Sequence, residues 1–155
     1  MNVRRLDAED RAWLRETLRD GWGGEAMAGH GELFFPAEHD GFVADGRAGV
    51  VTFRIVGDAC EITLIESFEP GRGVGTSLLE AVLAEARVAG CSRVWLVTTN
   101  DNEHAQRWYT ARGFTVTELR PGAVDEARRT LKPEIPAVGQ GGVAITDEIE
   151  YSLAL

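Results

Sequence analysis

Apolar residues change their spacing several times along the chain, and each change predicts a new element of secondary structure. In residues 13–18 and 78–86 they recur three and four positions apart, which predicts a helix with one buried face in each segment. Residues 41–56 and 60–67 are rich in β-branched and aromatic residues, which favour strands. An Asp-Gly pair at residues 45–46 predicts a turn that divides the first of these segments into two strands.

The second half of the chain alternates strands with helices. Residues 93–99 are almost entirely apolar, as expected of a strand that is buried on both faces. Asn102 and Gly113 are residue types that begin and end helices, so the segment between them is expected to be helical. The other predicted elements are a strand at 114–119, a short helix at 124–131 and a strand at 148–155, with loops at 21–31 and 133–142. This alternation predicts an α/β fold with at least one parallel pair of strands.

Chain length and composition indicate one globular domain spanning residues 1–155. A chain of this length buries about 70% of the surface of its unfolded state, which is enough for a core without disulfide or metal staples. The 16 basic and 25 acidic side chains give a net charge of −9, which argues against a general nucleic-acid partner. This charge is compatible with a cationic substrate, although many soluble proteins are acidic throughout.

No segment of the sequence indicates a membrane or metal site. The N-terminal residues contain no apolar stretch of the kind found in signal peptides, and no apolar run approaches the length of a membrane span. Cys60 and Cys91 lack the spacing and the histidine partners of a metal site, so we interpret them as small buried apolar residues. We therefore expect a cytoplasmic protein with no metal and no membrane partner.

The segment EPGRGVGTSLLEAVLAEA places Gly71, Gly73 and Gly75 directly before a predicted helix. It does not match the dinucleotide fingerprint G-x-G-x-x-G, because position 76 is a threonine, and it lacks the Gly-Lys-Ser/Thr of a P-loop. A glycine turn at a helix N-terminus exposes backbone N–H groups at the positive end of the helix dipole, and Arg72 adds a further charge. These features favour a phosphate or pyrophosphate site, with a plain strand-to-helix turn as the alternative.

A second segment, TTNDNEHAQRWYTARGF, places Asn102, Ala105 and Tyr109 on one face of a predicted helix. On this evidence alone Tyr109 is either a core residue or a catalytic one. Together, the two segments resemble the GNAT family of acetyl-CoA-dependent N-acetyltransferases. The family's later signature, Asn-x-x-Ala-x-x-x-Tyr-x-x-x-Gly-Phe, is filled at every fixed position by these three residues and by Gly113 and Phe114.

The resemblance covers residues 41–119 and departs from the family at one position of the cofactor loop. The family's loop reads Gln/Arg-x-x-Gly-x-Gly/Ala, and Pro70 takes the place of its first residue. Because proline has no N–H and a fixed φ, one polar contact to the pyrophosphate of the cofactor is expected to be missing. The residues that the resemblance implies for cofactor binding are Ile65, Gly71, Arg72, Gly73, Val74, Gly75, Thr76 and Asn102.

The resemblance implies a GNAT-like mixed central sheet of about six or seven strands flanked by about four or five helices. It also implies that an acetyl group moves directly from acetyl-CoA, the cosubstrate, to the amine of a small molecule or a peptide. A non-catalytic module of the same fold that only senses acyl-CoA is the alternative, and a phosphate binder unrelated to CoA is a third interpretation. A homodimer is left open.

The resemblance further suggests roles for catalytic residues. Tyr109 matches the family's general acid, which protonates the departing thiolate. Glu61 and Glu66 are the candidates for the base; strict alternation would put them on opposite faces of their strand, and the bulge that the family carries here would bring them together. Glu61 is favoured, because partial burial between apolar neighbours would make its carboxylate more basic; the alternative is that both glutamates are solvated surface residues. A backbone N–H near Ile65 is the expected oxyanion donor.

Residues 21–40 are expected to cover the acceptor site. His30 and His39 lie in this segment and are either alternative bases or plain surface residues. The segment also contains three acidic residues, Glu32, Glu38 and Asp40. An acidic mouth would concentrate cations and repel carboxylates, which favours an amine acceptor without a nearby carboxylate. The competing explanation is that acidic residues are spread evenly for solubility.

Overall fold

The computed structural model describes residues 1–155, which form two compact units. The first unit comprises Met1–Glu25, Phe35–Val94 and Ala154–Leu155, and the second comprises Ala26–Phe34 and Trp95–Leu153. Because each unit is assembled from separate segments, the chain passes between them several times. None of the helices combines the length and apolar character that a membrane crossing requires.

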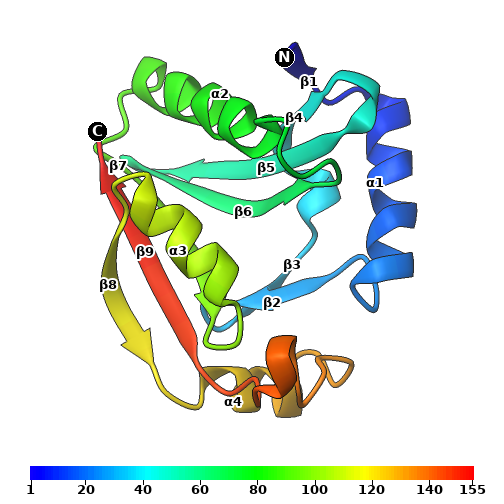
Figure 1. The fold of residues 1–155 in the computed structure, drawn as a ribbon, viewed down its shortest axis with the longest axis vertical. Coiled ribbons are helices and arrows are strands. Elements are labelled where there is room, and N and C mark those ends of the chain that lie inside the picture. The colour runs from blue at the N-terminus through cyan, green and yellow to red at the C-terminus, as the bar shows by residue number, and fades with distance from the viewer. The chain divides into compact units, whose positions relative to one another are not determined.

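Four antiparallel strands and two α-helices form the first unit. Its elements are β1 (Val3–Arg5), α1 (Ala8–Gly21), β4 (Asp40–Ala44), β5 (Gly49–Val56), β6 (Ala59–Ser67) and α2 (Val74–Val88), with short 3-10 turns η1 (Pro36–Glu38) and η2 (Asp45–Arg47). The strands are hydrogen-bonded in the order β1-β4-β5-β6, and α2 packs against β4, β5 and β6 (Figure 1). Val51 and Phe53 of β5 and Leu78 and Val82 of α2 are fully buried, as the apolar spacing predicts.

A capping arrangement at the start of α1 connects three elements of this unit. The Asp7 carboxylate accepts a hydrogen bond from the Asp10 N–H at 2.8 Å, and the Asp10 carboxylate accepts one from the Asp7 N–H at 3.0 Å. Asp10 is fully buried and also accepts hydrogen bonds from the guanidinium groups of Arg4, at 3.0 Å, and Arg47, at 3.1 Å. The hydrogen bond from Arg4 is the main reason that the pKa of Asp10 lies well below its usual value.

We expect Asp10→Asn to lower the free energy of unfolding by about 2 kcal/mol at pH 7, because the amide loses the charge that two guanidinium groups stabilise. Both arginines are partly exposed, so water compensates for part of the loss. Because the folded-state pKa of Asp10 is lowered, its contribution is fully present above the unfolded-state value of ~3.9 and is lost as the pH falls through the folded-state value.

Urea unfolding at about pH 7 and about pH 3 measures this stability and its pH dependence. Asp20→Asn, an exposed position in the last turn of α1, is the matched control and should change the free energy of unfolding by less than about 0.5 kcal/mol. A loss from Asp10→Asn that is the same at both pH values would show that its charge is not what stabilises the unit.

Three strands, a separate hairpin and two α-helices form most of the second unit. Its elements are β2 (Met27–Gly29), β3 (Glu32–Phe34), β7 (Arg93–Thr99), α3 (Glu103–Ala111), β8 (Thr115–Arg120), α4 (Ala123–Thr130), the 3-10 turn η3 (Gln140–Gly142) and β9 (Glu148–Ala154). The first two residues of β7 belong to the first unit. The strands are hydrogen-bonded in the order β7-β9-β8, with β8 and β9 antiparallel and side by side (Figure 1).

Residues 22–26 are irregular, as expected for the predicted loop at 21–31, but the rest of that segment forms a hairpin of β2 and β3. Met27 pairs with Phe34, and a two-residue turn of His30 and Gly31 connects the strands. Both turn residues have positive φ, 52° for His30 and 76° for Gly31, which is the pattern of a type I′ hairpin turn. The sequence prediction was wrong here because histidine replaces the asparagine or aspartate that usually marks such a turn.

The architecture belongs to the expected α/β class, with seven strands in the two hydrogen-bonded orders above and four α-helices. The helices expected from apolar spacing and from the Asn102 and Gly113 signals are confirmed. The three-residue strand β1 and the hairpin were not predicted. The expectation of a single domain at residues 1–155 stays a prediction.

Candidate functional site

The turn before α2 exposes backbone N–H groups at a helix N-terminus. Gly71 and Gly73 have positive φ angles of 81° and 73°, in the left-handed region that favours glycine. Gly73 is the N-cap of α2 and has no side chain to accept hydrogen bonds from the first turn of the helix. A Cβ atom at either glycine would meet no atom within 4 Å, so the turn borders open space. The N–H groups of Val74 and Gly75 are therefore available to an anionic ligand.

Two residues of this turn, Arg72 and Pro70, affect which groups can contact an anion there. Arg72 Nη1 donates a hydrogen bond to Glu69 Oε1 at 2.9 Å, and both side chains are exposed. An exposed ion pair of this kind contributes no more than about 1 kcal/mol, so it can open when an anion binds. Pro70 is exposed and has no N–H to donate. The residues present therefore fit a phosphate or pyrophosphate group held mainly by backbone N–H groups.

A β-bulge interrupts β6 halfway along its pairing with β5. Phe53 of β5 lies opposite Ile62 of β6. The preceding residue of β5, Thr52, lies opposite Leu64, so Thr63 is an extra residue on β6. The bulge that the resemblance implied is therefore confirmed.

The bulge places both candidate glutamates on one face of β6. Glu61 lies opposite Arg54 of β5, and Glu66 lies opposite Val50. Because Arg54 and Val50 are four residues apart on β5, their side chains point to the same face, and so do those of the glutamates opposite them. A regular strand would have put the two carboxylates on opposite faces.

The two glutamates differ in their surroundings. Glu61 is buried, and Arg54 Nε donates a hydrogen bond to Glu61 Oε1 at 2.7 Å, so this carboxylate already has a cationic partner. Glu66 is half-buried, and its carboxylate has no hydrogen bond or ion pair in the structure. Burial raises the pKa of Glu66. These differences favour Glu66 as the base, whereas the sequence favoured Glu61.

A chain of three polar side chains lies beside the bulge on the same face. Thr52 Oγ1 and Thr63 Oγ1 are 2.7 Å apart, and His39 Nδ1 lies 2.9 Å from Thr63 Oγ1. Burial lowers the pKa of His39, so its ring is mostly neutral at pH 7 and is a second candidate proton acceptor. No sequence pattern predicted this row of hydrogen-bonded side chains, because the bulge that brings Thr63 beside Thr52 depends on the register of β6 with β5.

Asn102 and Tyr109 both belong to the region of α3, in the second unit. Asn102 caps the helix, as its position in the sequence predicts, with its Oδ1 accepting a hydrogen bond from the Ala105 N–H at 3.1 Å. Tyr109 is buried, and its ring centroid lies 5.5 Å from that of Phe114 and 6.0 Å from that of Tyr151. These contacts hold the Tyr109 ring in place, which is compatible with either a core or a catalytic role.

The residues predicted to form the site fall into two groups. The first unit contains Glu61, Ile65, Glu66, residues 71–76, Glu38, His39 and Asp40, and the second contains Asn102, Tyr109, His30 and Glu32. No set of three or more His, Cys, Asp or Glu side chains is placed to hold a metal ion. The roles of these residues in binding and catalysis stay predictions.

Comparison with known sequences finds one family over most of the chain. Residues 3–114 match the model of the acetyltransferase (GNAT) family. The chain is also 42% identical over 143 residues to YdhI of Bacillus subtilis, an uncharacterised protein, covering 90% of this chain and 89% of that one. The family match thus includes both the glycine turn and the Asn102–Tyr109 segment.

Solved structures of acetyltransferases have the same fold. A GNAT family acetyltransferase from Elizabethkingia anophelis with acetyl-CoA bound is similar, with a TM-score of 0.70 and 17% identity over 99% of this chain and 97% of that one. A Bacillus subtilis acetyltransferase in complex with CoA gives a TM-score of 0.69 and 15% identity over 99% of this chain and 98% of that one. At these identities the similarity concerns the fold alone.

Proposed function

Because the chain belongs to the acetyltransferase (GNAT) family, we propose that it transfers an acetyl group directly from acetyl-CoA to the amine of a small molecule or a peptide. The observation that carries the proposal is the glycine turn before α2. Its two glycines with positive φ, its uncapped helix N-terminus and the open space around it suit the pyrophosphate of the cosubstrate.

The acceptor amine must lose a proton before it can attack, and Glu66 is the proposed acceptor of that proton. An amine with a pKa of ~10.4 becomes neutral at pH 7 at a cost of about 4.6 kcal/mol, whereas an amine near ~8 requires only about 1.4 kcal/mol. A base is therefore most useful for the more basic acceptors. The half-buried carboxylate of Glu66, with its raised pKa, supports this role.

Acetyl-CoA supplies the thioester that the amine attacks, and two further groups of this chain complete the proposed mechanism. The backbone N–H of Ile65, on β6 just after the bulge, is proposed to stabilise the oxyanion. The Tyr109 hydroxyl is proposed to give its proton to the departing sulfur. This transfer is favourable only where the thiolate is poorly solvated, since a tyrosine (~10) is ordinarily a weaker acid than a thiol (~8.5).

We expect Gly73→Val to weaken acetyl-CoA binding about tenfold or more, because a β-branched residue resists positive φ and its side chain would fill the space beside the turn. Gly57→Val is the matched control, since Gly57 also has a positive φ, of 61°, and open space around it, but lies in the turn between β5 and β6. Calorimetry should show a loss of affinity only for Gly73→Val. Equal affinity in a folded Gly73→Val variant would remove the cofactor assignment.

The function itself is tested by measuring free thiol released from acetyl-CoA in the presence of a panel of amines. An acetyltransferase releases thiol in proportion to acetylated product, with turnover that depends on the amine supplied. A module that only senses acyl-CoA would bind acetyl-CoA in calorimetry and release no thiol with any amine. That result would contradict the proposed reaction while leaving the binding site in place.

A further inference from the structure

One exposed phenylalanine lies directly before the glycine turn. Phe68 follows the last residue of β6 and is 40% exposed, and it is the only exposed large apolar side chain between β6 and α2. The glycine turn begins three positions later, at Gly71. Because cofactor sites combine aromatic side chains with a few polar groups, a ring beside an anion site raises the question of whether both contact one ligand.

The backbone holds both ends of the turn against two consecutive residues of the first unit. The Phe68 N–H donates a hydrogen bond to the carbonyl oxygen of Ala48 at 2.8 Å. Gly49, the next residue, packs against the start of α2, since a Cβ atom there would lie 2.5 Å from Val74 Cγ1. Phe68 and Val74 therefore flank the same short segment, which places Phe68 beside the N-terminus of α2 within one unit.

A row of side chains supports the ring of Phe68. The ring of Trp13, in α1, meets it nearly edge-on, with the two centroids 6.0 Å apart and the planes at 83°. The guanidinium carbon of Arg47 lies 5.4 Å from the centroid of the Trp13 ring, and Arg47 Nε donates a hydrogen bond to the buried Asp10. Arg47 has a positive φ of 54°, which is unfavourable for a residue with a Cβ atom. Strained residues of this kind are concentrated at binding and active sites.

The chemical structure of acetyl-CoA indicates which part of it lies near this ring. The molecule contains one aromatic group, the adenine base, and a single ribose joins this base to the pyrophosphate. If the glycine turn binds the pyrophosphate, the base is therefore restricted to the surroundings of the turn. Adenine is flat and uncharged, and nucleobases stack on exposed aromatic side chains. The pantetheine chain and the thioester contain no ring that could stack in this way.

We propose that Phe68 stacks against the adenine base of acetyl-CoA, with Trp13 and Arg47 holding its ring in position. This role rests on the proposed function, because it requires the glycine turn to hold the pyrophosphate of the same molecule. Phe68 then contributes to the binding of the cosubstrate and takes no part in the transfer of the acetyl group. Removing its ring should weaken the binding of acetyl-CoA and leave kcat at saturating acetyl-CoA unchanged.

Calorimetry with acetyl-CoA and with acetyl-4′-phosphopantetheine tests this role, because the second ligand keeps the thioester and one phosphate and lacks the adenosine. We expect Phe68→Ala to bind acetyl-CoA about tenfold more weakly than the wild type does, and to bind acetyl-4′-phosphopantetheine equally well. Phe68→Trp keeps an aromatic surface and should retain the affinity for acetyl-CoA. Phe35→Ala is the matched control, since Phe35 is 42% exposed in the same unit but lies outside the turn, and it should change neither affinity.

Steady-state thiol release adds a second measurement, in which Phe68→Ala should raise the KM for acetyl-CoA and leave kcat unchanged. Unchanged affinity of Phe68→Ala for acetyl-CoA would overturn the stacking role. Equal losses for the two ligands would also overturn it, because Phe68 would then support the shape of the turn. Both results would leave the acetyltransferase assignment intact, since the wild type would still bind acetyl-CoA. A loss confined to acetyl-CoA, without thiol release from any amine in the wild type, would support the stacking role and contradict the proposed function instead.

Discussion

Tyr109→Phe should lower kcat by about 10²-fold on an established acceptor and should barely change the affinity for acetyl-CoA. The substitution removes only the hydroxyl, so the proposed proton donor is lost, and a positioned acid contributes at least this factor. The aromatic ring that packs against Phe114 and Tyr151 remains, so the second unit should keep its core. Steady-state thiol release gives kcat, and calorimetry gives the affinity.

Tyr151→Phe is a matched control for this prediction. Tyr151 is a second buried tyrosine in the same aromatic group, with its ring 6.0 Å from that of Tyr109, and its replacement removes the same atoms from the same unit. We expect it to change kcat much less than Tyr109→Phe does. If Tyr109→Phe retains full turnover, or if both variants lose activity equally, Tyr109 is a packing residue and the departing sulfur takes its proton from elsewhere.

The elements that the sequence predicted well are those whose signals are local. The helix α2 has a repeating apolar face and a glycine turn before it, and α3 has Asn102 as an N-terminal cap and Gly113 just after its end. The strand β7 shows an apolar run, but only Val94 and Leu96, on one face, are buried, so the expected burial of both faces was wrong. In each case neighbouring residues contain the whole signal, so no knowledge of strand pairing is needed.

The elements that were missed are short or carry an unusual turn. The strand β1 has three residues, too few for a period to be recognised, and it is defined only by its pairing with β4. The hairpin of β2 and β3 has three residues on each side of a His-Gly turn. A strand of three residues is defined by the strand with which it pairs. For β1 that strand is β4, which lies far along the chain.

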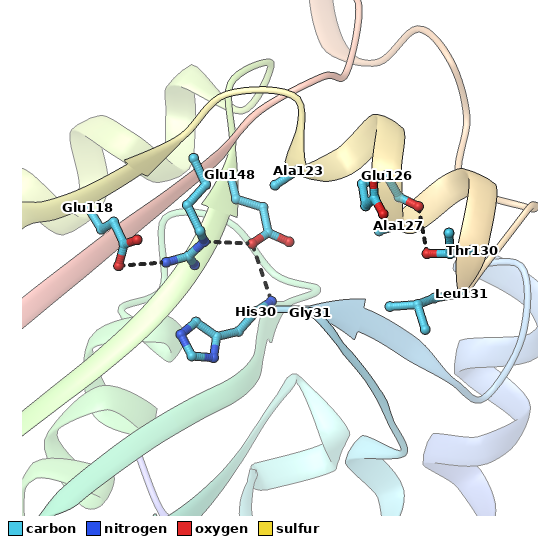
Figure 2. A pocket seen from close by; sticks show the side chains of 10 residues that line it. His30, Gly31, Glu118, Ala123, Glu126, Ala127, Thr130, Leu131 and Glu148 are labelled. Atoms are coloured by element: carbon cyan, nitrogen blue, oxygen red, sulfur yellow. Dashed lines mark hydrogen bonds and ion pairs between the residues drawn. The ribbon is translucent and has the colours of Figure 1, made fainter.

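The candidate site divides in the same way. The glycine turn and the Asn102 cap could be identified from spacing alone. The positions of Glu61 and Glu66 could not, because the bulge at Thr63 becomes visible only in the register of β6 with β5. The partner of Glu61 is likewise a cross-strand residue, Arg54. The hydrogen bond from the His30 N–H to Glu148 also joins residues more than a hundred positions apart in the sequence (Figure 2).

The second large effect is expected from Glu66→Gln, which should lower kcat by about 10²-fold for an acceptor with a pKa of ~10.4 and by only about tenfold for one near ~8. The difference follows from the deprotonation cost, since a base helps most when the amine holds its proton most tightly. Measuring thiol release with two primary amines of different pKa gives both ratios. Equal losses for the two amines would indicate that Glu66 supports the structure of β6 and does not take the proton.

The pH profile separates Glu66 from the other candidates. In the wild type, activity should rise with pH through the raised pKa of Glu66, because only the deprotonated carboxylate accepts a proton. In Glu66→Gln this limb should disappear and leave only the rise due to the amine itself. Glu61→Gln is the matched control on the same face of β6, and its carboxylate is bound to Arg54. If Glu61→Gln loses this rise in activity with pH and Glu66→Gln keeps it, Glu61 is the base. If both variants keep the rise, the neutral ring of His39 becomes the leading candidate. Because burial lowers the pKa of His39, activity would then fall only at a correspondingly low pH.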